Sequence, residues 1–441
     1  MRNTGILFAW VALATAQTTS APTLPLSLKR AVEIALAPDG NARAQIAEEA
    51  IQQAKARAAQ SRAAFLPDLE TSVLDENLTR NLKTFGISIP PNPFFSLPAV
   101  VPPFTVFDAR ASVTQTVFDF GAFRRYQASR SSVDAAKADN DSTRDQVTDQ
   151  VARAYLAALR SDAALTTAVA NVELSQALLD LARKQKGAGT GIGIDITRAE
   201  VQLANDRQRS LEAETDRYRA HLQLLRTIGL DLDADVVLTD KLSYEPGQRL
   251  ELAQALSIAN KSRADLRAQE KREQSARLSY NAVGMERLPS LAAFADYGTT
   301  GTAIDNASPT RTYGVSLRIP VFDGGRREGR RAEGFSQYRE EQIRTQDLKR
   351  QIGLDVRVAL DGLRSANSQV AAAQEGLQLS ENELAQAQRR YKAGVATGVE
   401  VTDAQTRLQR ARDNQIVALY NYNVARIDLA TAMGTIQTSL P

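Results

Sequence analysis

The amino-acid sequence contains the same pattern twice, and this duplication constrains the fold more than any other feature. Five segments of the first half return in the same order in the second half. The matched segments are residues 27–36 and 250–259, 65–69 and 287–291, 117–121 and 321–325, 186–197 and 392–402, and 228–229 and 433–434. Because an internal repeat encodes one structural unit used twice, we expect both halves to fold alike. Each half is predicted to form a short helix, a helix, a strand, a loop, a strand, a very long helix, a glycine turn and a helix.

The duplication also divides the chain into parts. We predict a first structural repeat over residues 17–229, a linker over 230–249, a second repeat over 250–435 and a C-terminal tail at 436–441. Strands are expected at about residues 66–81, 105–119, 289–301 and 310–323. Residues 17 to about 25 are rich in Thr, Ser and Pro, so we expect a lead-in without regular structure.

The first sixteen residues are typical of a secretory signal peptide. Arg2 precedes an apolar run at residues 5–13, and Ala14-Thr15-Ala16 provides a small-residue cleavage site. The run is too short to span a bilayer, for which about 20 apolar residues are needed. The alternative is a buried N-terminal helix. No later segment has the length and apolarity of a transmembrane helix, so a mature protein that enters a membrane must do so as β-strands.

The helical segments are unusually long. Residues 122–186 and 326–392 contain no proline, and each would extend about 100 Å at a rise of 1.5 Å per residue. Shorter helices of nearly matching total length are expected at about 41–64 and 195–228 in the first half and at 261–287 and 399–433 in the second. Two short helices placed end to end could therefore lie antiparallel along each long one.

A heptad pattern supports close packing of these helices. Val401, Leu408, Gln415, Tyr422 and Leu429 recur every seven residues, with Ala404, Ala411, Ala418, Ala425 and Ala432 between them. The first half keeps the pattern loosely, at Ile196, Ala199, Leu203, Ala213, Ala220 and Leu224. Alanine at one heptad position lets helix axes approach closely. Taken alone, this stripe also fits a long soluble coiled coil.

The strand segments alternate between apolar and polar residues. Tyr313, Val315, Leu317, Ile319 and Val321 alternate with polar or small residues, as do Phe107, Ala109, Ala111 and Val113. This pattern suits a strand between lipid and a wet lumen, but a half-buried strand of a soluble sheet shows it too. The proline-dense segment 89–103 and the polar segment 299–309 are predicted to be exposed loops between the strands.

The composition argues against several classes of function. The chain has no cysteine and a single histidine, His221, which excludes thiolate metal sites, cysteine nucleophiles and multi-histidine sites. Lys plus Arg number 54 and Asp plus Glu number 51, so the chain lacks the strong basic excess of a nucleic-acid-binding protein. The glycine-rich segment 187–193 follows a helix and lacks a Gly-Lys-Ser/Thr ending, so it is not a nucleotide-binding loop. We expect no enzymatic activity, no cofactor and no bound metal, and a packed or solvated role for His221.

In combination, these features resemble the TolC family of outer-membrane efflux proteins, over about residues 26–435. The most specific match is the strand-to-helix junction at residues 318–325, with Pro320, Phe322, Asp323, Gly324 and Gly325, and the second match is 391–394 with 399–404. The resemblance implies a mostly α-helical homotrimer in which each protomer gives four strands to a shared twelve-stranded β-barrel. The helices would continue it as a coiled-coil tunnel across the periplasm. It also implies a periplasmic adaptor and an inner-membrane pump or ABC transporter as partners. Without a cysteine for a lipid anchor, the barrel alone must hold the protein in outer-membrane lipid.

The same resemblance assigns roles to the two glycine turns. It implies that Glu400 and Asp403 line the periplasmic entrance, and that Asp195 with Tyr391 helps to hold the entrance closed. The adaptor-docking tips would be Gly187, Gly189 and Gly193 in the first turn and Lys392, Gly394 and Gly398 in the second. Ala396 stands where the family often has a basic residue, which leaves the closing contacts open. The alternative for all three acids is that they only offset a helix dipole, which contributes about 0.3–1 kcal/mol.

The predicted function is an outer-membrane exit duct of a tripartite efflux or type I secretion system. Cargo and partner choice cannot be read from the sequence, and small molecules and secreted proteins both fit. The competing hypothesis is a periplasmic coiled-coil adaptor or structural protein, which would place a lipoyl-like or β-barrel domain beside one hairpin. Repeated three times, Glu400 and Asp403 would form a carboxylate ring that favours cations.

Overall fold

The computed structural model describes residues 24–86, 99–246 and 250–439. The helices are α1 Leu28–Ala35, α2 Ala42–Ala63, α3 Phe120–Gly187, α4 Gly193–Ile228, α5 Leu252–Ser262, α6 Ala264–Met285, α7 Arg326–Lys392, α8 Gly398–Met433 and α9 Ile436–Ser439. The strands are β1 Leu24–Leu26, β2 Asp68–Asn81, β3 Val100–Phe118, β4 Val236–Leu238, β5 Ser290–Gly301 and β6 Ser308–Arg318. Short 3-10 turns occur at Leu82–Phe85 and Ile304–Asn306. The predicted signal peptide at 1–16 and most of the predicted proline-dense loop lie outside the described residues.

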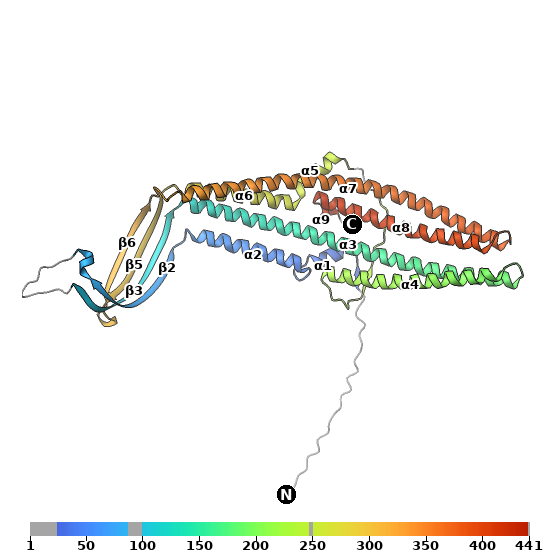
Figure 1. The fold of residues 1–441 in the computed structure, drawn as a ribbon, viewed down its shortest axis with the longest axis horizontal. Helices are drawn as coiled ribbons and strands as arrows, with labels where there is room; N and C mark the ends of the chain where they lie inside the picture. Colours follow the sequence, from blue (N-terminus) through green and yellow to red (C-terminus); the bar gives the residue numbers. More distant parts are fainter. Residues whose placement is uncertain (1–23, 87–98, 247–249, 440–441) are drawn as a thin grey trace, which may run out of the picture.

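The molecule is an elongated bundle with a sheet at one end and two glycine turns at the other (Figure 1). The long helices α3 and α7 contain 68 and 67 residues, which corresponds to about 100 Å each. The short helices α2 and α4 pack end to end along α3, and α8 packs along the part of α7 nearest the turns. Helix α6 packs against both α3 and α7 and so joins the two halves. We call α3–α4 the first hairpin and α7–α8 the second hairpin.

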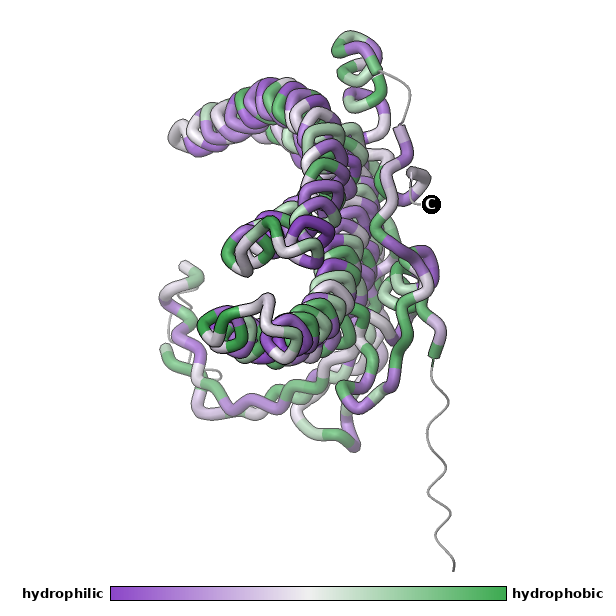
Figure 2. The backbone as a smooth tube through the Cα atoms, turned by 90° about the vertical axis from the view of Figure 1, so that its right-hand side faces the viewer, coloured by the Kyte–Doolittle hydropathy of each residue, from purple (hydrophilic) through white to green (hydrophobic). Residues whose placement is uncertain are grey.

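The helices form a curved layer, which appears C-shaped when viewed along the bundle (Figure 2). The predicted alanine seam is buried: Ala404, Ala411, Ala418, Ala425 and Ala432 are all under 9% exposed. Val401, Leu408, Tyr422 and Leu429 are buried with them. Small residues at these positions allow the close helix contacts that the heptad pattern predicts.

The strands form one antiparallel sheet in the order β2-β3-β5-β6. Because side chains alternate across a strand, the register places apolar residues on one face and polar residues on the other. Leu69, Val113, Ala295 and Tyr313 lie side by side on the apolar face. Glu70, Ser112, Asp296 and Thr312 form a row on the polar face. Large apolar side chains of the first face are exposed, namely Leu69, Val73, Tyr297, Tyr313 and Val315.

Two predicted strand boundaries were wrong. Strand β3 begins at Val100 instead of about 105, although Pro102 and Pro103 lie within it. The register with β2 shifts between Leu78 and Arg80, opposite these prolines, so their absent N–H groups fall where the ladder is interrupted anyway. Strand β6 spans Ser308–Arg318 and not 310–323. It stops just before Pro320, which cannot donate a ladder hydrogen bond.

A small parallel pair of strands, β1 with β4, ties the start of the chain to the linker. The Tyr155 hydroxyl on α3 lies 2.9 Å from the Leu26 carbonyl oxygen and 2.8 Å from Asp240 Oδ2. The Leu28 amide donates to the same Asp240 oxygen at 2.8 Å. The predicted irregular lead-in was therefore too long, since Leu24–Leu26 is a strand. The predicted tail also contains helix α9, which is anchored by the fully buried Ile436.

Within the described ranges, no helix has the length and apolarity needed to cross a membrane. The adaptor hypothesis predicts one hairpin beside a lipoyl-like or β-barrel domain. The described residues instead form two long hairpins that share one four-stranded sheet.

Candidate functional site

The two glycine turns have the same backbone geometry. In the first turn Gly189 has a φ of +78°, and in the second turn Gly394 has a φ of +71°. The residue after each glycine closes the turn: the Thr190 amide donates to the Gln185 carbonyl, and the Val395 amide to the Arg390 carbonyl, both at 3.1 Å. A left-handed residue at this position is the usual end of a helix, and only glycine adopts it without steric cost. The repeat therefore builds both tips in one way.

The predicted docking residues lie at these exposed ends. Gly187, Gly189, Lys392 and Gly394 are exposed, and so are the apolar side chains of Ile192, Ile194, Val395 and Val399. Val395 is 68% exposed. The Gln185 side-chain amide donates to the Lys392 carbonyl at 3.4 Å, which brings the tips of the two hairpins together. These four aliphatic side chains are open to solvent at the ends of the hairpins.

Asp195 lies between the two hairpins and is only 6% exposed. The Tyr391 hydroxyl donates to its Oδ2 atom at 3.4 Å, and the Arg198 guanidinium lies 3.6 Å from its Oδ1 atom. A Cβ atom built on Gly398 would lie 2.6 Å from the Asp195 carboxylate. Gly398 is therefore a glycine because the carboxylate of the opposite hairpin occupies the space of a side chain.

Tyr391 is buried with Leu384, Ala387, Val401, Ala404 and Leu408 of the second hairpin, and leucines of α3 pack against this cluster. Burial raises the pKa of its hydroxyl, and the neighbouring Asp195 charge raises this pKa further. The hydroxyl thus stays protonated and able to donate well beyond neutral pH. The structure brings Asp195 and Tyr391 together, as the prediction requires.

Glu400 and Asp403 are in a different environment. Glu400 is half-exposed and forms an ion pair with Arg390 at 3.1 Å, across the second hairpin. Asp403 is exposed and has no ion pair or hydrogen bond with the described residues. Both carboxylates are accessible to solvent, as residues lining an entrance would be, but Arg390 partly offsets the charge of Glu400.

The helix-dipole alternative remains compatible with two of the acids. Asp195 and Glu400 each lie in the first turn of their helix, α4 and α8. Neither carboxylate accepts a hydrogen bond from a helix amide within the described ranges. Each acid can therefore stabilise its helix only by offsetting the helix dipole. For Asp195, burial against the other hairpin is the dominant feature. Ala396 adds no polar side chain to the contact between Asp195 and Tyr391.

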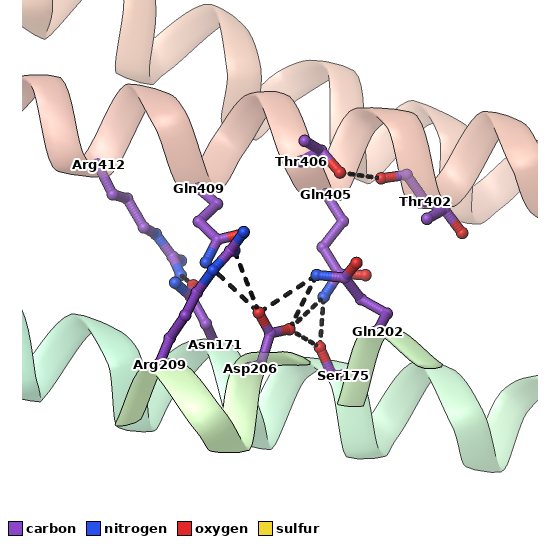
Figure 3. Close-up of polar contacts among 10 residues, drawn as sticks. All are labelled: Asn171, Ser175, Gln202, Asp206, Arg209, Thr402, Gln405, Thr406, Gln409 and Arg412. Carbon is purple, nitrogen blue, oxygen red and sulfur yellow. Dashed lines mark hydrogen bonds and ion pairs between the residues drawn. The ribbon is translucent and has the colours of Figure 1, made fainter. Parts of the chain in front are cut away.

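The sequence analysis missed a buried polar layer deeper in the bundle (Figure 3). We call it the Asp206 layer. Its members are Ser175 on α3, Gln202, Asp206 and Arg209 on α4, and Gln405 and Gln409 on α8. The spacing of Gln202 to Asp206 and of Gln405 to Gln409 places each pair on one helix face. Nothing in the sequence indicates that these two faces meet.

The strand-to-helix junction is a compact cap at the start of α7. Asp323 Oδ2 accepts hydrogen bonds from the Arg327 amide at 3.2 Å and from its Nε at 2.8 Å, which lowers the pKa of Asp323. Gly324 and Gly325 have φ values of +69° and +85°, so the turn requires glycine at both positions. In the first half, Asp119 caps α3 by accepting from the Ala122 amide at 3.0 Å. Phe322 is 86% exposed, next to the sheet.

The single histidine is part of a structural contact between α3 and α4. His221 Nε2 and Arg217 Nε lie 2.9 and 2.7 Å from the same oxygen of Asp162. Burial alone would raise the pKa of Asp162, but hydrogen bonds from His221 and Arg217 outweigh it, so the pKa lies below its usual value. Among the residues that the structure describes, no group of three or more His, Cys, Asp or Glu could hold a metal ion.

Comparisons with known proteins agree with this architecture. A family model described as outer membrane efflux protein matches residues 37–230 and again 255–435. The pyoverdine export outer membrane protein OpmQ of Pseudomonas putida is 26% identical over 394 residues, which cover 87% of this chain and 81% of the relative. The outer membrane protein TolC of Vibrio cholerae is 24% identical over 298 residues, covering 65% of this chain and 67% of the relative. The open state of the MtrE outer membrane channel of Neisseria gonorrhoeae shares the fold, with a TM-score of 0.77 at 17% identity over 92% of this chain and 88% of that one.

Proposed function

This chain belongs to the outer membrane efflux protein family, and on that premise we propose that three copies form an exit duct through the outer membrane of a Gram-negative bacterium. The duct passes small molecules or proteins from a transporter in the inner membrane to the exterior. The observation that carries this proposal is the pairing of one exposed apolar sheet face with rods about 100 Å long. The sheet suits lipid, and the rods have the length to reach across the periplasm.

Closure of the sheet is the reason for a trimer. Strands β2 and β6 are the edges of the four-stranded sheet, and lipid does not tolerate unpaired backbone groups. Joining β6 of one copy to β2 of the next would close three sheets into a barrel of twelve strands. In that barrel the exposed apolar face with Tyr313 and Val315 contacts lipid, and the polar face with Asp296 faces the lumen. An N-terminal signal peptide would direct the chain to this membrane.

The tips are proposed to dock a periplasmic adaptor protein. Both turns present glycines and exposed aliphatic side chains at the far end of the rods from the sheet. Such a surface can accept a partner hairpin by apolar contact without rearranging its backbone. The adaptor would connect the duct to an inner-membrane pump or ABC transporter, which supplies the energy that a passive channel does not.

The entrance would lie between the tips. Glu400 and Asp403, both accessible to solvent, are proposed to line it, and Asp195 with Tyr391 to hold it closed. The role of the protein is therefore conduction and gating of a path, and we assign no catalytic residue.

Insertions in the turns test this function. A pair of bulky residues inserted at Gly394, or separately at Gly189, should abolish efflux of a panel of antibiotics and dyes, because the docking surface is displaced. The heat-sensitive trimer should still be extracted from the outer membrane at the wild-type level, which controls for folding. Efflux that survives both insertions would show that the tips do not dock. Recovery of a soluble periplasmic monomer after fractionation and crosslinking would contradict the channel itself.

A further inference from the structure

The Asp206 layer joins three helices, α3 and α4 of the first hairpin and α8 of the second. Asp206 is 1% exposed, and its carboxylate accepts hydrogen bonds from Ser175 on α3, from Gln202 on its own helix, and from Gln405 and Gln409 on α8. Gln405 also donates to the Ser175 hydroxyl at 2.5 Å. A buried carboxylate is tolerated only when its acceptor sites are filled. Moving α8 away from α4 would remove two of these donors and leave the buried carboxylate with fewer hydrogen bonds.

A small cavity continues from this layer toward the tips. It measures about 30 Å³, and a buried water molecule needs about 10–15 Å³ of such space. Its polar lining comes from Ser175, Gln202 and Gln405 of the Asp206 layer and from Asp195, Tyr391 and Thr402. Asp195 and Asp206 are eleven residues apart on α4, or about 16 Å along the helix. The cavity therefore lies between the closing contact at the tips and the Asp206 layer.

The cavity presents hydrogen-bond acceptors. Asp195 Oδ1 is buried and has no hydrogen-bond donor among the residues that the structure describes. Gln202 and Gln405 use their NH₂ groups on the Asp206 layer. Their amide oxygens point away from Asp206, toward the side on which Thr402 lies (Figure 3). A species that fills this space must supply hydrogen-bond donors or positive charge.

The local charges favour a neutral donor. Asp195 has Arg198 at 3.6 Å, and Asp206 has Arg209 at 3.6 Å, so each carboxylate already has a cation of its own. An added metal ion would leave the pocket with excess positive charge. Water fits the volume, supplies two donors and adds no charge.

We propose that this cavity binds one water molecule that donates to Asp195 Oδ1 and to the amide oxygen of Gln202 or Gln405. The water joins Asp195 and Tyr391 to the Asp206 layer, and together they form a lock that holds α8 against α3 and α4. This inference rests on the proposed channel function and deepens it. The lock extends about three helical turns from the tips, so the closed entrance does not depend on a basic residue at Ala396.

Filling the cavity tests the lock. Ala199 lines the cavity on α4, and Ala199→Val should place methyl groups where the water sits and leave Asp195 Oδ1 without a donor. In single-channel recordings from planar bilayers, the open probability of the variant should rise about fivefold to tenfold. Ala213→Val, about four turns along the same helix and outside the cavity, should behave as wild type. Equal open probabilities for the wild type and Ala199→Val would overturn the lock.

Two further measurements keep the test decisive. Gln405→Leu removes an acceptor for the water and two hydrogen bonds of the layer, so it should also raise the open probability. It replaces Ala199→Val as the test if that variant does not assemble. A high-resolution crystal structure of the wild-type trimer should show density within hydrogen-bond distance of Asp195 Oδ1. Anomalous density there after a soak in rubidium or thallium salts would mean a cation site and would contradict the water. If the wild type conducts no ions in bilayers, the channel proposal fails, while the crystallographic result still decides the water site.

Discussion

Asp195 and Glu400 occupy equivalent positions of the repeat, yet their surroundings differ. Asp195 is 6% exposed and faces the backbone of the other hairpin at Gly398. Glu400 is half-exposed and pairs with Arg390 on its own hairpin. Both are acids in the first turn of a helix, so the local sequence predicts the same environment for both. The difference comes from what the second hairpin places in front of each one.

The glycines that begin the two helices show the same asymmetry. A side chain at Gly193 would meet only the Lys186 Nζ atom, at 3.6 Å and at the end of a flexible side chain. A side chain at Gly398 would overlap the Asp195 carboxylate. The first tip therefore has room for a side chain at its helix-starting glycine, whereas the second tip has none. Under the function proposed above, Asp195 would hold the entrance closed and Glu400 would face what passes.

The largest effect is expected at Gly398. Gly398→Val should force the hairpins apart, since overpacking a close contact costs about 1–3 kcal/mol. That energy corresponds to a shift of about 5- to 150-fold in the equilibrium between closed and open entrances. Channel open probability in bilayers, or uptake of a large antibiotic by cells, measures it. The matched change Gly193→Val should have little effect, and equal effects of the two would remove the asymmetry.

The second expected effect concerns the solvent-facing acids. Two carboxylates about 6 Å apart repel by about 3 kcal/mol at an effective dielectric of 20, so a ring of them attracts cations. We expect the wild-type channel to be cation-selective and blocked by trivalent cations from the periplasmic side. Changing Glu400 and Asp403 together to alanine should weaken this block at least tenfold without altering assembly. Asp195→Asn should change the open probability of the channel and leave the block by trivalent cations intact. Loss of the block in that variant would mean that Glu400 and Asp403 are not the ring that binds these cations.

The smallest effect is expected at Arg390. Arg390→Ala removes the cation beside Glu400, and the block by trivalent cations should strengthen about twofold to threefold. Stability should change by less than about 1 kcal/mol, because exposed ion pairs contribute little. Arg183→Ala breaks a similar pair with Glu200 at the first tip, at 3.0 Å, and should leave the block unchanged. An unchanged block in Arg390→Ala would mean that Glu400 does not face the conducting path.

Much of the architecture could be predicted because its signals are local or repeated. The absence of proline set the limits of the long helices, and their bounds in the structure differ from the prediction by only a few residues. The heptad alanines identified the buried face of α8, and strand alternation identified the two faces of the sheet. The strand ends were less accurate, because a bulge opposite Pro102 and Pro103 cannot be seen in one strand alone.

The site could be predicted only in part. Asp195, Tyr391 and the turn glycines are brought together as the repeat and the family pattern indicate. The Asp206 layer depends on residues more than 190 positions apart, such as Asp206 and Gln405, meeting across hairpins. From sequence alone, a glutamine on an amphipathic helix is predicted to face solvent. Its burial can be recognised only when the partner helix is known. The burial of Asp195 has the same origin, since only the fold places Gly398 against it.

The parallel pairing of β1 with β4 has a consequence for how the chain is made. Leu24 pairs with Val236, so the first strand waits for a partner more than 200 residues later in the chain. Contacts between distant residues form slowly because the intervening segment must first be brought into a closed loop. Because the chain becomes available for folding from its N-terminus onward, Leu24–Leu26 has no partner strand until the whole first half has emerged. Pairing of β1 with β4 therefore marks the completion of that half, and any factor that shields newly made chain has its longest task near Leu24–Leu26.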